Sequence, residues 1–206
     1  MSRRPHAESY DTRRRLLQSA EQEFALQGYD KASLRQICTS AGVTTGALYF
    51  FFDNKEDLFK NVLISVTKNA IQILENYTQQ LLISNKRNLE DTPLGNKETL
   101  DKFLDLLYSH RHVVQILVNN QENQYVARFF EELTEAISLT IKAILYPNVA
   151  QITPHDDFII AWLAQIEIVT LVTILKNDET REEADSHINS AVMFMQGGIE
   201  ALSTKL

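Results

Sequence analysis

The chain has 206 residues, of which 44% are apolar and 23% charged, and it carries a net charge of −7 at pH 7. This length and apolar content suit a globular protein with a substantial buried core, in one or two domains. The single cysteine, Cys38, excludes an intramolecular disulfide and favours a cytoplasmic location. No apolar leader with a small-residue cleavage site is visible, so we expect no secretory signal.

The acidic excess lies outside the N-terminal quarter. Residues 1–60 carry nine Lys or Arg against eight Asp or Glu, whereas residues 61–206 carry eleven against nineteen. The net charge therefore does not exclude a nucleic-acid partner for the N-terminal part. Arg3, Arg4 and Arg13–Arg15 form a basic stretch that could follow a phosphate backbone or enter a minor groove as an arm.

The most informative segment is 33–59, SLRQICTSAGVTTGALYFFFDNKEDLF. Ser33 with Gln36 forms a capping box, and Gly42 stands where a left-handed residue ends a helix. Thr44 is a natural N-cap for a second short helix, and Asn54 for a third. The sequence thus predicts a helix-turn-helix over about 33–52, a layout that lays its second helix into the major groove of DNA.

This segment, with LLQSAEQEFALQGYDKASLRQI before it and AGVTTGALY within it, is similar to the TetR family of transcriptional regulators over about residues 10–60. The resemblance implies an all-α fold with a helix-turn-helix domain at 1–55 and a helical effector-binding and dimerisation domain at 56–206. It also implies a repressor that binds a palindromic operator as a homodimer and is released by a small molecule. The operator, the effector, the regulated genes and the sign of regulation do not follow from the sequence, so an activator is the alternative to a repressor.

The resemblance assigns DNA contacts to Ser33, Thr44, Thr45, Gly46, Tyr49, Phe50 and Lys55. The serine, the tyrosine and the lysine would bind phosphates, and the other four would face base edges. Two departures from the family pattern stand out. Thr45 replaces a frequent lysine, and Phe51 replaces a histidine or tyrosine that often donates to phosphate.

The rest of the chain predicts helices. A long helix is expected over 58–82, then a polar loop at 84–98, a helix around 103–108 and another over about 123–145. Pro147 and Pro154 bracket a second loop. No strand-like alternation and no internal repeat is visible, so the expected fold is all-α.

Apolar residues occur on every face of the segment Phe158–Leu175, and such a helix must be covered all round. Gln165 and Glu167 near its centre make membrane insertion costly, so a buried helix is the better interpretation. A second subunit could supply part of the cover; burial of both last helices inside one monomer is the alternative. The predicted dimer interface comprises Ile168, Leu171, Val172, Leu175, Ile188, Val192, Met195 and Ile199.

The resemblance also implies an effector pocket in the C-terminal domain. The candidate lining residues combine aromatic bulk with one polar group, the alternative being that they are ordinary core: Phe103, Leu107, Tyr125, Phe129, Trp162, Gln165 and Ile166. An apolar small molecule is the expected class of effector.

The sequence argues against an enzyme more strongly than against a protein-binding module. No phosphate-binding glycine loop, serine elbow or paired CxxC is present, and His110 and His112 are two residues apart, not the four that a helical metal pair needs. We therefore expect no enzyme, cofactor or metal site. A helical protein–protein interaction module that does not bind DNA remains the alternative.

Overall fold

The computed structural model describes residues 4–84, 92, 95–146 and 152–203, and only the backbone of 4–8 and 199–203. All regular structure in these ranges is α-helical, as predicted. The helices are α1 (Arg4–Lys31), α2 (Leu34–Ala41), α3 (Thr45–Phe51), α4 (Lys55–Ser84), α5 (Lys97–Ser109), α6 (Arg111–Asn119), α7 (Gln124–Leu145), α8 (Pro154–Asn177) and α9 (Arg181–Ser203).

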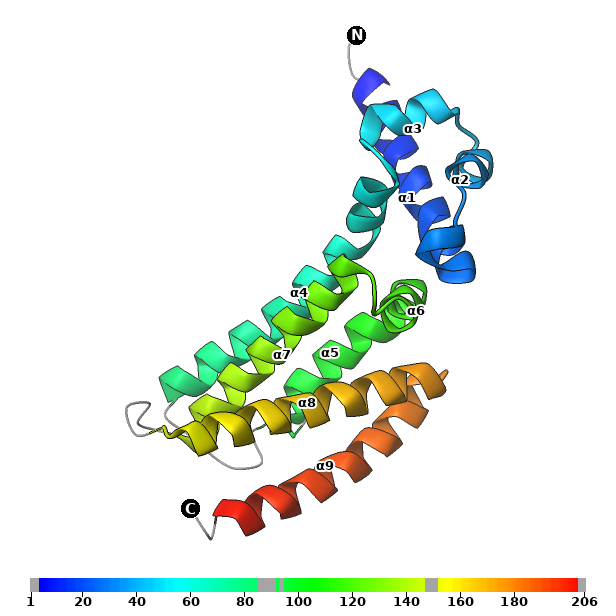
Figure 1. The fold of residues 1–206 in the computed structure, drawn as a ribbon. Helices are drawn as coiled ribbons and strands as arrows, with labels where there is room; N and C mark the ends of the chain where they lie inside the picture. Colours follow the sequence, from blue (N-terminus) through cyan, green and yellow to red (C-terminus); the bar gives the residue numbers. More distant parts are fainter. Residues whose placement is uncertain (1–3, 85–91, 93–94, 147–151, 204–206) are drawn as a thin grey trace.

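The helices form a small head, α1–α3, and a larger body, α4–α9 (Figure 1). Helix α4 leaves the head and runs along the body, with α7 beside it (Figure 1). Helices α5 and α6 connect α4 to α7, and α8 crosses the far side of the body with α9 against it. The last helix therefore lies at the end of the molecule away from the head.

The predicted caps define the helix-turn-helix. The Ser33 hydroxyl accepts from the Gln36 N–H (3.3 Å), and the Thr44 hydroxyl accepts from the Ala47 N–H (3.2 Å). Gly42 has φ of 65°, a left-handed conformation that strains other residues, and it ends α2. The turn and both short helices are therefore encoded locally.

One detail of the capping prediction is wrong. The Gln36 side chain does not return to Ser33 but contacts the Ser40 hydroxyl (3.4 Å). The Ser33 N–H donates instead to the Glu23 carboxylate of α1 (3.0 Å). The second half of the capping box is thus supplied by another helix, which ties α2 to α1.

The predicted helices agree with the structure in position but not always in number. Helix α4 is unbroken over 30 residues. The helix expected around 103–108 is followed by a separate helix, α6, which the sequence interpretation missed. The two meet at His110, whose N–H donates to the Leu107 carbonyl (3.2 Å). Most of the predicted loop 84–98 and Pro147 lie outside the described residues.

An aromatic cluster fixes the head to the start of α4. The rings of Phe24 and Phe59 lie edge to face with centroids 5.0 Å apart, and Tyr29 lies 4.8 Å from Phe59. Gly28, with φ of 74°, breaks α1 and turns Tyr29 toward this cluster. The Tyr29 N–H then donates to the Asn120 side chain at the end of α6 (3.1 Å). The head is therefore fixed to the body at two places, α4 and α6.

Helix α8 is, among the described helices, the one that is long and apolar enough to cross a membrane by length and composition alone. Core helices of globular proteins pass the same test, and α8 packs against α6, α7 and α9. Its buried face includes Ile160, Leu163, Ile168 and Leu171. This packing fits the predicted core helix better than it fits a membrane-spanning helix.

The same buried face of α8 carries an acid. Glu167 is 3% exposed, and its Oε2 atom has no hydrogen-bond partner. Burial raises the pKa of Glu167 from an ordinary 4.5 to about 8, because the apolar interior disfavours the charged form. At neutral pH the side chain is therefore mostly protonated.

This burial makes stability depend on pH. The folded pKa lies above the unfolded one, so the contribution of Glu167 to the free energy of unfolding is greatest below pH 4.5 and falls as pH rises toward 8. The loss amounts to about 1.4 kcal/mol for each pH unit between the two pKa values. Urea unfolding at pH 5, 7 and 9 should show this slope in the wild type and lose most of it in Glu167→Gln. The exposed Glu131→Gln should keep it; an unchanged slope in Glu167→Gln would contradict the assignment.

Candidate nucleic-acid interface

Helix α3 has one face in the core and one in solvent. Leu48 and Phe52 are almost completely buried, whereas Phe50 is 78% exposed and Tyr49 54% exposed. Thr44, Thr45 and Gly46, at the start of the same helix, are also exposed. The structure therefore brings five of the seven predicted DNA contacts together on one open surface of the head.

The hydroxyl groups on this surface remain available as donors. Ser33 and Thr44 use their oxygens to accept from the backbone, so each O–H hydrogen is free to reach a phosphate. Ser33 is exposed at the start of α2. The Tyr49 hydroxyl has no hydrogen-bond partner in the part of the chain that the structure describes. The head thus exposes three neutral donors, at the start of α2, at the start of α3 and on α3 itself.

Gly46 is not required by the packing of the protein itself. A Cβ atom built on it would meet only the Thr44 hydroxyl oxygen, at 3.8 Å, which is ordinary contact. The protein's own packing would therefore accommodate a side chain at position 46. A glycine at this place lets the helix backbone approach another surface closely.

Lys55 is only partly available. Its ammonium group donates to the Asp30 carbonyl (3.0 Å) and lies over the Tyr29 ring, 5.1 Å from the centroid. Burial lowers its pKa, because the charged form loses solvation. The hydrogen bond from the Lys55 ammonium to Asp30 joins α4 to α1. The predicted phosphate contact would use the other N–H groups of this ammonium.

The basic stretch at the N-terminus is helical and not an extended arm. Arg13 donates to Asn61 (2.6 Å) and lies over the Phe52 ring (5.3 Å). Arg14 and Arg15 both pair with Asp11, at 2.7 Å and 3.1 Å. These three arginines therefore stabilise the head. Arg3 and the Arg4 side chain lie outside the described residues.

Two basic residues near the interface were missed. Lys31 and Arg35 flank Ser33, are exposed, and have no ion pair within the described ranges. The sequence could have indicated them, because both basic residues lie within two positions of Ser33, the N-cap of α2. They are the positive charges best placed to meet the phosphates beside Ser33.

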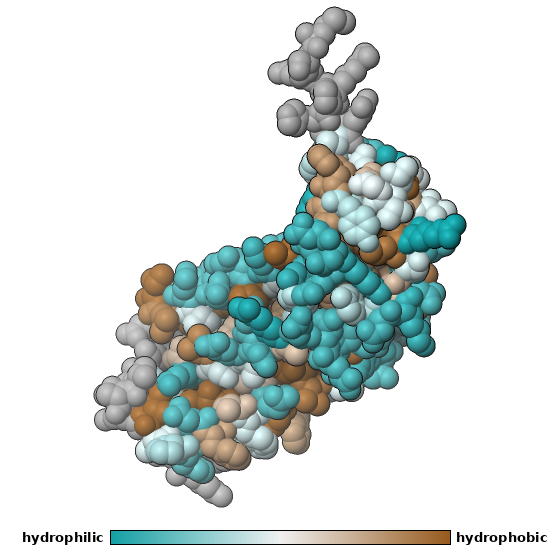
Figure 2. Space-filling view, turned by 45° about the horizontal axis from the view of Figure 1, so that its top comes forward, coloured by the Kyte–Doolittle hydropathy of each residue, from teal (hydrophilic) through white to brown (hydrophobic). Residues whose placement is uncertain are grey.

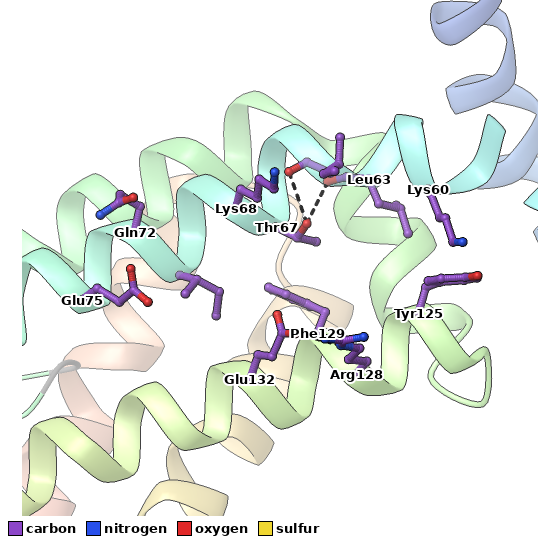
Figure 3. Close-up of a pocket in the computed structure, with 12 residues that line it drawn as sticks. Lys60, Leu63, Thr67, Lys68, Gln72, Glu75, Tyr125, Arg128, Phe129 and Glu132 are labelled. Atoms are coloured by element: carbon purple, nitrogen blue, oxygen red, sulfur yellow. Dashed lines mark hydrogen bonds and ion pairs between the residues drawn. The ribbon is translucent and has the colours of Figure 1, made fainter. Parts of the chain in front are cut away.

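The predicted pocket residues do not form one site. Tyr125 and Phe129 line a groove between α4 and α7, with a cavity volume of about 540 Å³ (Figure 3). Phe103 and Leu107 are buried on α5, while Trp162 and Gln165 are exposed on α8. Ile166, also on α8, is half-buried. The pocket list therefore mixes core, groove and surface residues.

The predicted interface residues mostly face the interior of their own chain. Val172 and Val192 are half-buried, and Ile199 lies in α9 outside the described side chains. The others are buried within the single chain: Ile168, Leu171, Leu175, Ile188 and Met195. The apolar side chains of α8 and α9 that reach solvent are different ones, namely Phe158, Trp162, Val169, Met193 and Phe194.

Comparison with known proteins agrees with this geometry. Residues 16–62 match the family model described as bacterial regulatory proteins, tetR family. The HTH-type transcriptional repressor BepR of Brucella suis is 43% identical over 61 residues, 30% of this chain and 29% of that protein. The probable acrEF/envCD operon repressor of Escherichia coli is 36% identical over 81 residues, 39% of this chain and 37% of the relative. The chain thus spans less than half the length of these relatives.

Solved structures share the whole fold. A transcriptional regulator of the TerR/AcrR family from Aquifex aeolicus has a TM-score of 0.61 at 21% identity, covering 93% of this chain and 99% of that one. SmeT, the repressor of the Stenotrophomonas maltophilia multidrug efflux pump SmeDEF, has a TM-score of 0.62 at 18% identity, covering 90% of each chain. At this identity the likeness shows the fold alone.

A helix-turn-helix head with an exposed second helix, fixed to an all-helical body, has the architecture of helix-turn-helix proteins. Within this architecture, residues 16–62 form a domain that matches the tetR family model, and the curated repressors are similar to this part of the chain.

The division of α3 into a buried and an open face can be tested without DNA. Leu48→Ala should lower the free energy of unfolding by about 2–5 kcal/mol, because it leaves a cavity in the core of the head. Phe50→Ala should change it by no more than about 0.5 kcal/mol, because the ring is mostly in solvent. Urea denaturation followed by circular dichroism measures both. Equal losses would show that Phe50 packs inside the protein.

Proposed function

We propose that the chain is a cytoplasmic, dimeric repressor of transcription that binds an operator through α3 and is released by a small molecule. The observation that carries the proposal is the open surface of α3, where Phe50 and Tyr49 are exposed although the same helix buries Leu48. A phenylalanine that is 78% exposed contributes little to the stability of the head. Facing a major groove, it can contact a thymine methyl group.

A second copy of the chain is the proposed partner for α8 and α9. Phe158, Trp162 and Val169 lie along one exposed side of α8, and Met193 and Phe194 project from α9. In Figure 2 apolar residues gather at the end of the body away from the head, whereas its middle is mostly hydrophilic. Contiguous apolar surface of this kind marks an interaction site. Two-fold symmetry would then present two heads to a palindromic operator, with half-sites about one helical turn apart.

Release by a ligand requires that the ligand favour one spacing of the two heads over another. A ligand in the body could change this spacing, because the head is joined to the body through α4 and through the Tyr29–Asn120 hydrogen bond. A change in the position of α4 or α6 would therefore reach the head.

Contacts to bases and to phosphates should respond differently to substitution. Thr45→Val and Phe50→Ala should change the sequences enriched from a pool of random duplexes, because these side chains face base edges. Tyr49→Phe should weaken binding to all sequences by about fivefold to tenfold, the worth of roughly one hydrogen bond. Fluorescence anisotropy with the enriched duplex measures the affinity. If none of the three changes either quantity, α3 is not the contact surface.

Salt dependence separates a charged phosphate contact from a neutral one. Arg35→Ala should reduce the slope of log affinity against log salt concentration by about 1, because one cation fewer displaces counterions. Tyr49→Phe should leave that slope unchanged. A protein–protein interaction module would show no such slope with duplex DNA at all.

The proposed dimer surface gives a test with a matched control. Phe194→Asp, at a residue 81% exposed on α9, should yield monomers, because it places a charge in the apolar interface. Ile83→Asp, at a residue 84% exposed at the end of α4, should leave the mass unchanged. Light scattering coupled to size exclusion measures the mass. Substituting Ile168 or Met195 is no clean test, since both are buried in their own chain. A dimeric Phe194→Asp variant would contradict the proposed surface.

A further inference from the structure

Helix α3 has little apolar surface to hold it in place. It is seven residues long, and Leu48 is its one fully buried side chain. A helix of this length rises only about 10 Å, so a small tilt at one end moves the side chains at the other. The direction in which Thr45 and Phe50 point must therefore be fixed by contacts at the two ends of the helix.

The end of α3 is held by a carboxylate in the first turn of α4. Phe52 is the C-cap of α3, and the next residue, Asp53, donates its backbone N–H to Oδ2 of Asp57 (3.1 Å). The Asp57 N–H in turn donates to the side chain of Asn54 (2.9 Å), directly before α4. Asp57 thus joins the end of one helix to the start of the next.

The other oxygen of this carboxylate is bound from the next turn of α4. The amide nitrogen of Asn61 donates to Oδ1 of Asp57 (3.0 Å) and to the Asp57 carbonyl (2.9 Å). The amide oxygen of Asn61 accepts from the Arg13 guanidinium of α1 (2.6 Å). An amide can accept on one side and donate on the other, so Asn61 connects the cation of α1 to the anion of α4.

Arg13 also contacts the end of α3 directly. Its guanidinium lies over the Phe52 ring, 5.3 Å from the centroid, and that ring is 1% exposed. Arg13, Asn61 and Asp57 are each half-buried, which strengthens hydrogen bonds to charged groups. We call the connected groups Arg13, Asn61, Asp57 and the Asp53 N–H the α3 anchor. Arg13 therefore reaches the end of α3 twice, through a ring contact and through the anchor.

The neighbouring arginine is placed differently. Arg14 is exposed, and its guanidinium pairs with Asp11, one turn earlier in the same helix (2.7 Å). This contact stays within α1. Arg13 and Arg14 therefore form a matched pair with the same charge, in which Arg13 is the one connected to α3.

We propose that Arg13 is a positioning residue for DNA recognition. Through Asn61 and Asp57 it fixes the direction in which α3 presents Thr45 and Phe50 to base edges, without touching the duplex itself. The proposal rests on the function proposed above, because it assigns the base contacts to α3. A recognition surface must be held within about 0.5 Å of its working geometry. Loss of the anchor therefore lowers the discrimination between sequences more than it lowers binding to phosphates.

Affinity for two duplexes tests this role, one enriched by the wild type from a random pool and one of scrambled sequence. Arg13→Ala should lose roughly tenfold or more in affinity for the enriched duplex, and about twofold or less for the scrambled one. The control, Arg14→Ala, should stay within about twofold of the wild type on both. Fluorescence anisotropy well below every melting temperature keeps all variants folded. Equal losses of Arg13→Ala on the two duplexes would overturn the proposal.

Salt dependence separates positioning from a direct phosphate contact. Arg13→Ala should leave the slope of log affinity against log salt concentration unchanged, whereas losing a phosphate contact would reduce it by about 1. A reduced slope would show that Arg13 binds the DNA backbone, against the proposal. A lowered melting temperature with unchanged affinity would show a purely structural role and would overturn it as well.

A double-mutant cycle tests the connection through Asn61. Asn61→Ala alone should also lower affinity for the enriched duplex. Combining it with Arg13→Ala should cost about twofold or less beyond Arg13→Ala, because both substitutions break the same connection. Losses that multiply independently would show that Arg13 does not act through Asn61.

Hydrogen exchange tests the anchor without DNA. The Asp53 amide should exchange roughly fivefold faster or more in Arg13→Ala than in the wild type or Arg14→Ala, because its acceptor, Asp57, is held less firmly. Unchanged exchange would overturn the anchor whatever the DNA results. A wild type that enriches no duplex would instead refute the function proposed above, and with it the role of the anchor in recognition.

Discussion

The structure depends on one shared element, helix α4. Its first two turns complete the core of the head, where Phe59 meets Phe24, and its remaining length forms one wall of the body. Because the helix is unbroken over 30 residues, its two ends move together. The head therefore has no flexible linker, and its orientation is set by whatever α4 and α6 pack against.

The head shows how few of its polar groups are free for a partner. Three arginines that look like a DNA-binding arm in the sequence are used internally, on Asn61, Asp11 and the Ala41 carbonyl. Lys55 likewise joins α4 to α1. Among the side chains that the structure describes, the head exposes a set of hydroxyl groups, Phe50 and two unpaired cations beside the α2 N-cap. Such a surface would derive its sequence preference from shape and apolar contact more than from charge.

Local signals predicted the fold well. Ser33, Gly42 and Thr44 define the helix-turn-helix through backbone contacts within a few residues, and these were correct. The partner of the Ser33 N–H was not predictable, because Glu23 is distant in sequence. The break between α5 and α6 was also missed. It falls at His110, and histidine, unlike glycine or proline, does not by itself indicate the end of a helix. The exposed residues of α3 were among the predicted DNA contacts. Of the predicted pocket residues, only Tyr125 and Phe129 line the groove between α4 and α7.

The sequence by itself determined most of the helices, the caps at Ser33 and Thr44 and the turn at Gly42, because each rests on residues that interact with near neighbours along the chain. It also showed that α8 is apolar on all faces. Only the tertiary structure decided which of those faces is covered by the same chain. Ile168 and Phe158 are equally apolar in the sequence, yet one is buried and the other open, because burial depends on neighbouring helices. The groove was decided in the same way, by the packing of α4 beside α7.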